Sequence, residues 1–134
     1  MKYADVNVGD ELTPLAVPLT RTLIVATAIA SRDYQDVHHD PELARRRGSD
    51  DIFMNILSTN GFVGRFITDW AGPDAVLKKV AIRLGAPNYP GDTMTMTGKV
   101  TAKHDKTGVV EVAVRGANSR GDHVSGTVAL TLPT

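Results

Sequence analysis

The chain has 134 residues, of which 42% are hydrophobic and 22% charged, a composition typical of one folded domain over residues 1–134 and not of a disordered chain. Its 15 basic and 15 acidic residues leave no net charge, so no electrostatic field favours nucleic acid, and association with another subunit meets no charge barrier. There is no cysteine for disulfides or thiolate chemistry, no signal-peptide pattern and no apolar run of roughly 18–20 residues, so we expect a soluble, cytoplasmic protein without a membrane segment.

The N-terminal part is predicted to be mainly helical. Leu12 to Val17 suits a short edge strand. Residues 22–31 contain neither Gly nor Pro and repeat apolar side chains at helical spacing, which predicts a helix. A second, short helix is indicated by Asp40 at the N-cap, Pro41 at the first helical position and Gly48 as the stop.

The longest predicted helix runs from Asp51 to Trp70. Side chains at spacings of three and four form its expected buried face: Phe53, Ile56, Leu57, Asn60, Gly64 and Ile67. Gly61 and Gly64 each cost about 1 kcal/mol relative to alanine inside a helix. Close approach of another backbone would compensate for that cost.

The rest of the sequence is predicted to form four strands joined by turns. The expected strands are residues 76–84, 93–103, 109–118 and 123–132. In the second of them, methionines and a valine alternate with threonines, as in a strand with one buried face. The order of a short strand, helices and four strands is typical of an α+β protein with an antiparallel sheet. A long helix in such a protein is buried only if the sheet wraps it.

Asp33 and His38 are the leading candidates for chemistry. A carboxylate and an imidazole on one turn can hold a water between them and transfer its protons, although such pairs are also common in surface turns. The start of the long helix offers unpaired backbone N–H groups at Phe53, Met54 and Asn55. These groups could bind a carbonyl oxygen that becomes an enolate, unless an aspartate caps the helix instead.

The remaining histidines are expected to have structural or surface positions. His104 falls in a predicted hairpin loop, and His123 starts a strand, where packing or a hydrogen bond is the favoured interpretation. The four histidines show no recognisable metal-ligand spacing, so no metal site is predicted.

Two stretches resemble a known family. Residues 33–40 resemble the D-x-N-P-x-H-x-D signature of the MaoC-like (R)-specific enoyl-CoA hydratases, and residues 87–93 resemble that family's P-x-x-P-G-D-T turn. The resemblance covers nearly the whole chain and implies a hot-dog fold, in which an antiparallel sheet wraps a long helix. It also implies reversible hydration of a 2-enoyl-CoA, with Asp33 and His38 activating water. The backbone N–H groups of Met54 and Asn55 would form the oxyanion hole, and no cofactor beyond the coenzyme A of the substrate would be needed.

The sequence departs from the family pattern at several positions. Arg32 replaces a glycine, Gln35 an asparagine and Asp36 a proline. Met54 stands where the family's oxyanion-hole glycine lies, so a bulkier side chain reshapes the pocket there. Phe53 and Gln35 are the predicted substrate contacts.

Within the family, residues 31–40, 51–57 and 68–73 are most similar to the small subunit of the bacterial steroid side-chain enoyl-CoA hydratases. That similarity implies a steroid side-chain enoyl-CoA as substrate. It also implies an oligomer, either a homodimer or a heteromer with a second MaoC-like subunit.

Two alternative functions are compatible with the same sequence. A hot-dog acyl-CoA thioesterase uses the same helix end but usually carries its carboxylate on the long helix, where Asp69 is the only acid well inside and lies near the far end. A non-catalytic subunit that completes a partner hydratase would have no need of both Asp33 and His38.

Overall fold

The computed structural model describes all residues 1–134 and contains three α-helices and five strands. Two short 3-10 helices, Tyr3–Asp5 and Asp36–His38, accompany them. In chain order the main elements are β1 (Leu15–Pro18), α1 (Arg21–Ala30), α2 (Pro41–Arg46), α3 (Ile56–Ala71), β2 (Val76–Leu84), β3 (Thr93–His104), β4 (Val109–Asn118) and β5 (Gly121–Thr131). No helix is both long and apolar enough to cross a membrane.

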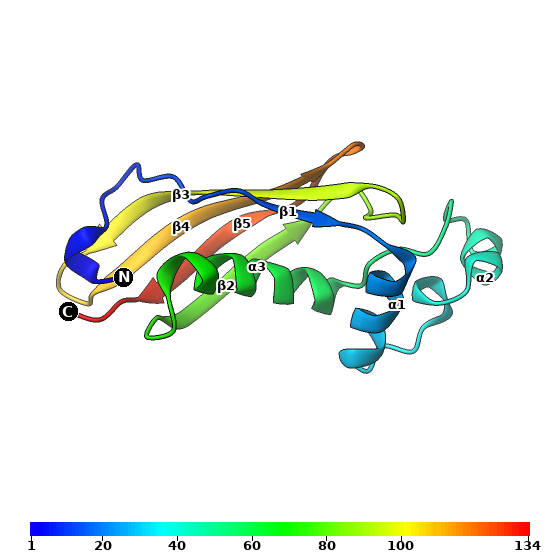
Figure 1. The fold of residues 1–134 in the computed structure, drawn as a ribbon, viewed down its shortest axis with the longest axis horizontal. Helices are drawn as coiled ribbons and strands as arrows, with labels where there is room; N and C mark the ends of the chain where they lie inside the picture. Colours follow the sequence, from blue (N-terminus) through cyan, green and yellow to red (C-terminus); the bar gives the residue numbers. More distant parts are fainter.

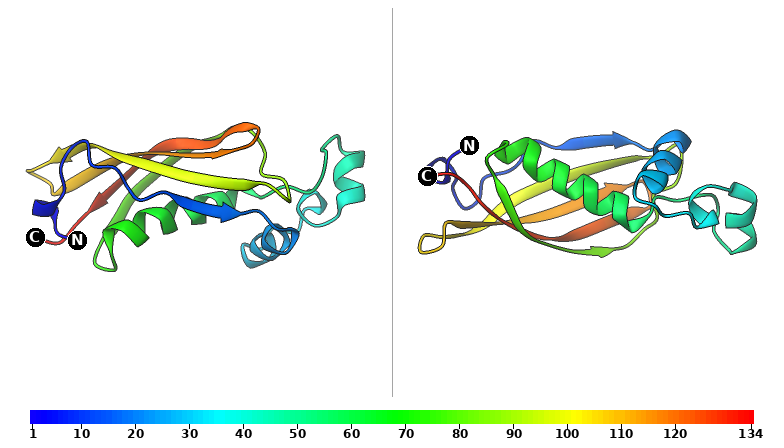
Figure 2. Two further views of the ribbon diagram at one scale, coloured as in Figure 1. Left: turned by 45° about the horizontal axis from the view of Figure 1, so that its top comes forward. Right: turned by 90° about the horizontal axis from the view of Figure 1, so that it is seen from below.

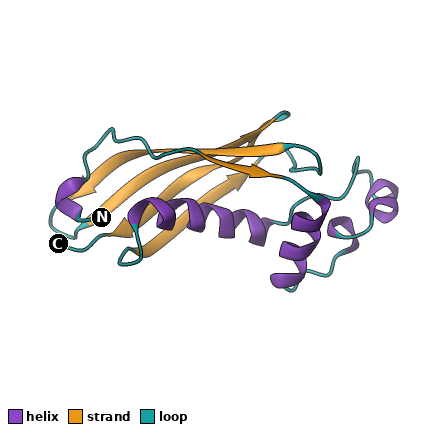
Figure 3. Cartoon of the chain, in the orientation of Figure 1, coloured by secondary structure: helices purple, strands orange, loops and turns teal.

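The five strands form one antiparallel sheet in the order β1-β3-β4-β5-β2. The sheet is strongly twisted, and α3 lies along its concave face (Figures 1 and 2). The helices α1 and α2 lie beyond one end of the sheet, and both chain termini lie at the opposite end (Figure 3). The predicted α+β architecture is therefore confirmed, with β1 and β2 as the two edges of the sheet.

The core lies between α3 and the inner face of the sheet. Met94, Met96 and Val100 of β3 are fully buried there, while the alternating threonines face outward, as the sequence pattern predicts. From α3, Phe66 packs so close to β3 that a Cβ on Gly98 would lie 3.0 Å from its ring. The glycine thus lets the aromatic ring approach the sheet.

The start of α3 differs from the prediction. The helix begins at Ile56 and not at Asp51, because Asn55 is its N-cap and accepts a hydrogen bond from the Ser58 N–H at 3.2 Å. Asp51 instead accepts two hydrogen bonds from Arg21, at 2.9 and 2.7 Å, and the buried Ile52 follows it as extended chain. Tertiary contacts therefore override the helical tendency of residues 51–55.

The predicted buried face of α3 is wrong, because Ile67 is the only one of its six residues that is buried. Ile56 and Leu57 are 50% and 51% exposed, whereas the side chains that face the core are Ser58, Thr59, Val63, Phe66, Ile67 and Ala71. The two glycines do not permit close approach of a backbone within this chain. A Cβ at Gly61 would meet nothing within 4 Å, and one at Gly64 would meet only the side chain of Leu77. The exposed Ile56 and Leu57 together with Gly61 therefore leave one face of α3 open and partly apolar.

Candidate functional site

The end of α1 turns the chain so that Asp33 faces the start of α3. Arg32 has φ +58°, and the N–H groups of Arg32 and Asp33 donate to the carbonyls of Ile29 and Ala28, both at 2.9 Å. This is the pattern of a helix C-terminus closed by a residue in the left-handed conformation, where glycine is preferred. The left-handed backbone at this position explains why the similar family's motif has a glycine there. Arg32 adopts that conformation in the present chain.

Replacing Arg32 with glycine is expected to raise the free energy of unfolding by about 0.5–1 kcal/mol. The left-handed conformation costs a non-glycine residue roughly 1–2 kcal/mol, and glycine avoids that cost. Glycine also loses more conformational entropy on folding, so only part of the cost is recovered as stability. The Arg32 side chain makes no hydrogen bond or ion pair that would be lost. Urea denaturation measures the change. Arg32→Ala is the matched control, and an equal gain in both variants would contradict the backbone explanation.

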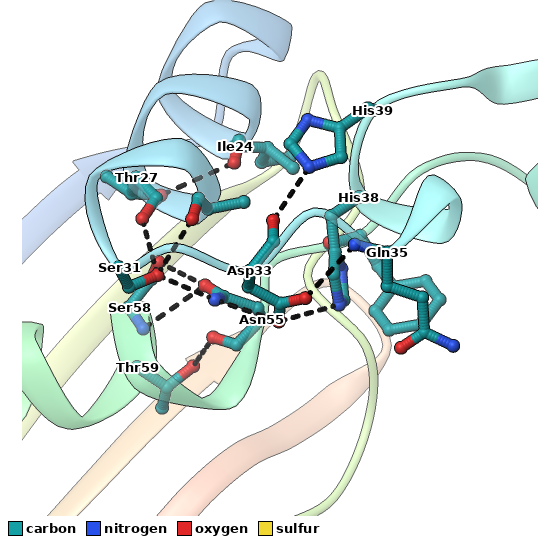
Figure 4. A network of polar contacts seen from close by, with 12 residues as sticks. Ile24, Thr27, Ser31, Asp33, Gln35, His38, His39, Asn55, Ser58 and Thr59 are labelled. Atoms are coloured by element: carbon teal, nitrogen blue, oxygen red, sulfur yellow. Dashed lines mark hydrogen bonds and ion pairs between the residues drawn. The ribbon is translucent and has the colours of Figure 1, made fainter.

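Asp33 and His38 meet as predicted. Oδ2 of Asp33 lies 3.3 Å from Nε2 of His38, and the histidine side chain is 7% exposed (Figure 4). Nδ1 of His38 lies 2.7 Å from the carbonyl oxygen of Phe53, so Nδ1 carries a proton and donates it to that bond. Nε2 of His38 and the Asp33 carboxylate are within ion-pair distance, so the carboxylate attracts the ring whenever Nε2 carries a proton.

Asp33 is held as a carboxylate. Burial alone would raise the pKa of Asp33, but a hydrogen bond from Nδ2 of Asn55 at 3.1 Å, another from the Gln35 N–H at 3.3 Å and attraction to His38 and His39 outweigh it. The pKa of Asp33 is therefore below its ordinary value. At neutral pH this side chain accepts protons and hydrogen bonds.

The Asn55 side chain joins the acid/base segment to α3. Its Nδ2 donates to Oγ of Ser31 at 2.9 Å and to Asp33, while its Oδ1 accepts from both the N–H and the hydroxyl of Ser58 (Figure 4). From the sequence, only the backbone N–H of Asn55 is expected to have a role in the site. No spacing rule connects an asparagine with an aspartate 22 residues earlier, so the sequence held no signal for this contact.

The predicted oxyanion hole requires a correction. The N–H of Met54 donates to the carbonyl of Asn88 at 3.1 Å, and that of Phe53 donates to the carbonyl of Val37 at 3.2 Å. Neither N–H is unpaired, so the expectation of a free amide at Met54 is wrong, and its role as an oxyanion-hole donor stays a prediction. The N–H groups of Asn55 and Ile56, by contrast, have no partner within the chain, as expected at a helix start.

One cavity of about 330 Å³ brings the predicted residues together. Its wall includes all six of them: Asp33, Gln35, His38, Phe53, Met54 and Asn55. The first residue of α3, the end of β2 with the loop after it, and the start of β5 complete the wall with Ile56, Leu84, Gly85, Pro87 and His123. The acid/base pair and the free amides of the helix start thus face one space.

His123 lies in the same wall but is fully engaged in structure. It is 2% exposed, its Nδ1 donates to the Ala86 carbonyl at 2.7 Å, and its Nε2 accepts the Thr59 hydroxyl at 2.8 Å. Burial lowers the pKa of His123, against a smaller opposing effect of the Ala86 hydrogen bond. The neutral ring ties β5 to the loop after β2 and to α3, in keeping with the structural role predicted for it.

The remaining candidates lie elsewhere. Asp69, the carboxylate considered for a thioesterase, pairs with Arg65 at 3.3 Å near the far end of α3 and does not line the cavity. His104 pairs with Glu111 on the surface. No group of three or more His, Cys, Asp or Glu side chains is arranged to hold a metal ion.

Comparison with known proteins gives concordant results. The family model described as "MaoC like domain" matches residues 6–120. The chain is 50% identical over 125 residues to the 3-oxo-4,17-pregnadiene-20-carboxyl-CoA hydratase beta subunit of Mycobacterium tuberculosis, covering 93% of this chain and 95% of that protein.

Solved structures agree with these sequence matches. The crystal structure of the ChsH1-ChsH2 complex from Mycobacterium tuberculosis contains a chain that is 50% identical, with a TM-score of 0.92 over 95% of this chain and 98% of that one. The (R)-hydratase from A. caviae involved in PHA biosynthesis has a TM-score of 0.88 at 19% identity, over 96% of this chain and 98% of that one. At such low identity the second likeness shows the fold alone, and it confirms the predicted hot-dog arrangement.

Proposed function

This chain belongs to the MaoC-like domain family, and from that premise we propose that it catalyses the reversible hydration of a 2-enoyl-CoA whose acyl group is a steroid side chain. One observation carries the proposal: the Asp33 carboxylate and the His38 ring lie 3.3 Å apart in a cavity that also contains the start of α3. The 50% identity with a hydratase beta subunit supports both the reaction and the steroid substrate.

In the proposed reaction the two side chains have separate tasks. Asp33, held as a carboxylate, accepts a proton from water as its hydroxide adds to C3 of the enoyl group. A proton on Nε2 of His38 is delivered to C2, and Asp33 then passes the proton from water across the 3.3 Å contact to Nε2. The bond from Nδ1 to the Phe53 carbonyl leaves Nε2 as the only ring nitrogen that exchanges protons. One water is added in total, with both new bonds formed from the same side.

The start of α3 would stabilise the enolate. As C3 is attacked, negative charge develops on the thioester oxygen, and the free N–H groups of Asn55 and Ile56 are suited to bind it. The positive end of the helix dipole adds to this attraction. Phe53 and Gln35 would contact the acyl-CoA from the cavity wall. Coenzyme A enters as part of the substrate, and the proposed steps need no other cofactor.

A second MaoC-like subunit is the proposed partner. The edge strand β2 exposes Val76 and Leu77 at 51% and 36%, and Leu77 lies next to Gly64 on the open face of α3. A second subunit that paired with the edge of β2 would satisfy the free backbone groups of this strand and would also cover the exposed apolar side chains. The similarity to one chain of the ChsH1-ChsH2 complex favours a heteromer over a homodimer.

The decisive experiment is an absorbance assay at the enoyl-thioester band with the chain purified together with its partner subunit. A steroid side-chain enoyl-CoA is expected to lose absorbance until equilibrium, faster than crotonyl-CoA, and to regain it when the hydrated product is supplied instead. A thiol reagent in the same assay separates the alternatives. Release of free coenzyme A in step with loss of substrate would contradict hydration and indicate a thioesterase.

A further inference from the structure

The orientation of the Asn55 carboxamide is determined by its neighbours. Oδ1 faces the Ser58 N–H, which can only donate, and Nδ2 faces the Asp33 carboxylate, which accepts. A rotation by 180° would place two donors together on one side and two acceptors together on the other. The side chain is 2% exposed and all four of its hydrogen-bonding positions are used, so water has no room to compensate for its loss.

The same Oδ2 atom of Asp33 meets both Asn55 and His38. It lies 3.1 Å from Nδ2 of Asn55 and 3.3 Å from Nε2 of His38. The other polar groups around the residue are the Gln35 N–H on Oδ1 and the His39 ring, whose Nε2 lies 2.8 Å from the Asp33 backbone carbonyl. Asn55 is therefore the one contact that reaches the Asp33 carboxylate from α3.

We propose that Asn55 is a positioning residue for hydration, whose carboxamide fixes the Asp33 carboxylate against His38 and holds that pair in register with the first turn of α3. This inference rests on the proposed function. Oδ1 caps the helix that presents the anion-binding amides, and Nδ2 holds the base, so one side chain sets the distance between the two halves of the reaction. Both parts of this coupling come from the carboxamide of Asn55.

If Asn55 only capped α3, replacing it with another good N-cap residue would leave activity unchanged, whereas a positioning role predicts a loss of activity. Aspartate and serine are N-cap residues about as good as asparagine, so Asn55→Asp and Asn55→Ser should both keep α3 intact. Asn55→Asp, however, places a second carboxylate against Asp33, and Asn55→Ser removes the donor without adding charge. Asn60→Asp is the matched control, because it makes the same chemical change on α3 at a side chain that does not contact Asp33.

The first measurement is the pH profile of kcat and KM for the chain in complex with its partner subunit. In Asn55→Asp, kcat is expected to fall about 100-fold or more, with a smaller change in KM, and the acid limb of the profile should move up by about one pH unit or more. Asn55→Ser should lose about 10-fold in kcat, and Asn60→Asp should match the parent protein. An unmoved acid limb in Asn55→Asp, or a loss of kcat that only follows a loss of thermal stability, would overturn the proposal.

The second measurement does not depend on catalysis. Carbon-13 NMR follows the titration of the Asp33 carboxyl in the parent protein and in Asn55→Ser, without substrate. The titration midpoint is expected below the ordinary carboxyl range in the parent and closer to it in Asn55→Ser. If the parent protein fails to hydrate enoyl-CoA but the midpoint still rises, only the proposed function fails. If the parent hydrates and the midpoint stays, only the role of Asn55 is overturned.

Discussion

Asp33→Asn is expected to lower kcat for hydration by about 10²–10⁴-fold, the range by which a positioned acid or base accelerates a reaction. Asparagine has nearly the same shape and can accept from the Gln35 N–H or from Nδ2 of Asn55, but not from both, so a small loss of stability is expected with the fold retained. It cannot take a proton from water. The initial rate of absorbance loss at the enoyl-thioester band measures the effect, and thermal unfolding verifies the fold.

His38→Asn is the companion variant. Asparagine can still donate to the Phe53 carbonyl, as Nδ1 of His38 does at 2.7 Å, but it has no atom at the position of Nε2. We expect a similar loss of kcat, and a double variant with Asp33→Asn that is scarcely worse than either single one, because the two groups act as a unit. A single variant with near-normal turnover would contradict the assignment of the pair.

The double substitution Val76→Asp and Leu77→Asp is expected to abolish assembly with the second subunit. Both side chains are exposed at the start of β2, so the isolated chain should fold as before. Buried in an interface, two unpaired carboxylates each cost several kcal/mol, enough to separate the subunits. Co-purification of the co-expressed subunits and light scattering measure the result.

Val8→Asp provides the control for that experiment. Val8 is 61% exposed but lies outside β2, so its replacement adds one surface carboxylate, half the charge of the double variant, without affecting the proposed interface. The complex should survive this change. Retained assembly in the double variant would exclude the edge of β2 from the interface.

Much of the fold could be predicted because the relevant signals are local. Met94, Met96 and Val100 alternate with threonines, and the strand is buried on that one face. The start of α3 could not be predicted in the same way. It depends on the ion pair of Arg21 with Asp51 and on burial of Ile52, and both involve parts of the chain that only the folded molecule brings together.

In the candidate site, too, contacts between residues close in the sequence could be predicted and contacts between distant residues could not. Asp33 and His38 are brought together by one turn and a 3-10 helix, so their proximity could be inferred from spacing. The fate of the Met54 amide depends on the carbonyl of Asn88, which belongs to the loop before β3, and no local pattern reveals it. The side-chain role of Asn55 was missed for the same reason.

The arrangement around Asn55 also has a consequence for protein design. Every group assigned to proton transfer or to enolate binding comes from one contiguous segment, residues 31–58, which contributes no strand to the sheet. The rest of the chain adds walls and two tethers: the Asn88 carbonyl in the loop before β3, which accepts from the Met54 N–H, and Arg21, which pairs with Asp51. Grafting residues 31–58 onto an inactive hot-dog scaffold should therefore transfer the reacting groups together, provided that the recipient supplies a carbonyl at the position of Asn88 and a cation at the position of Arg21.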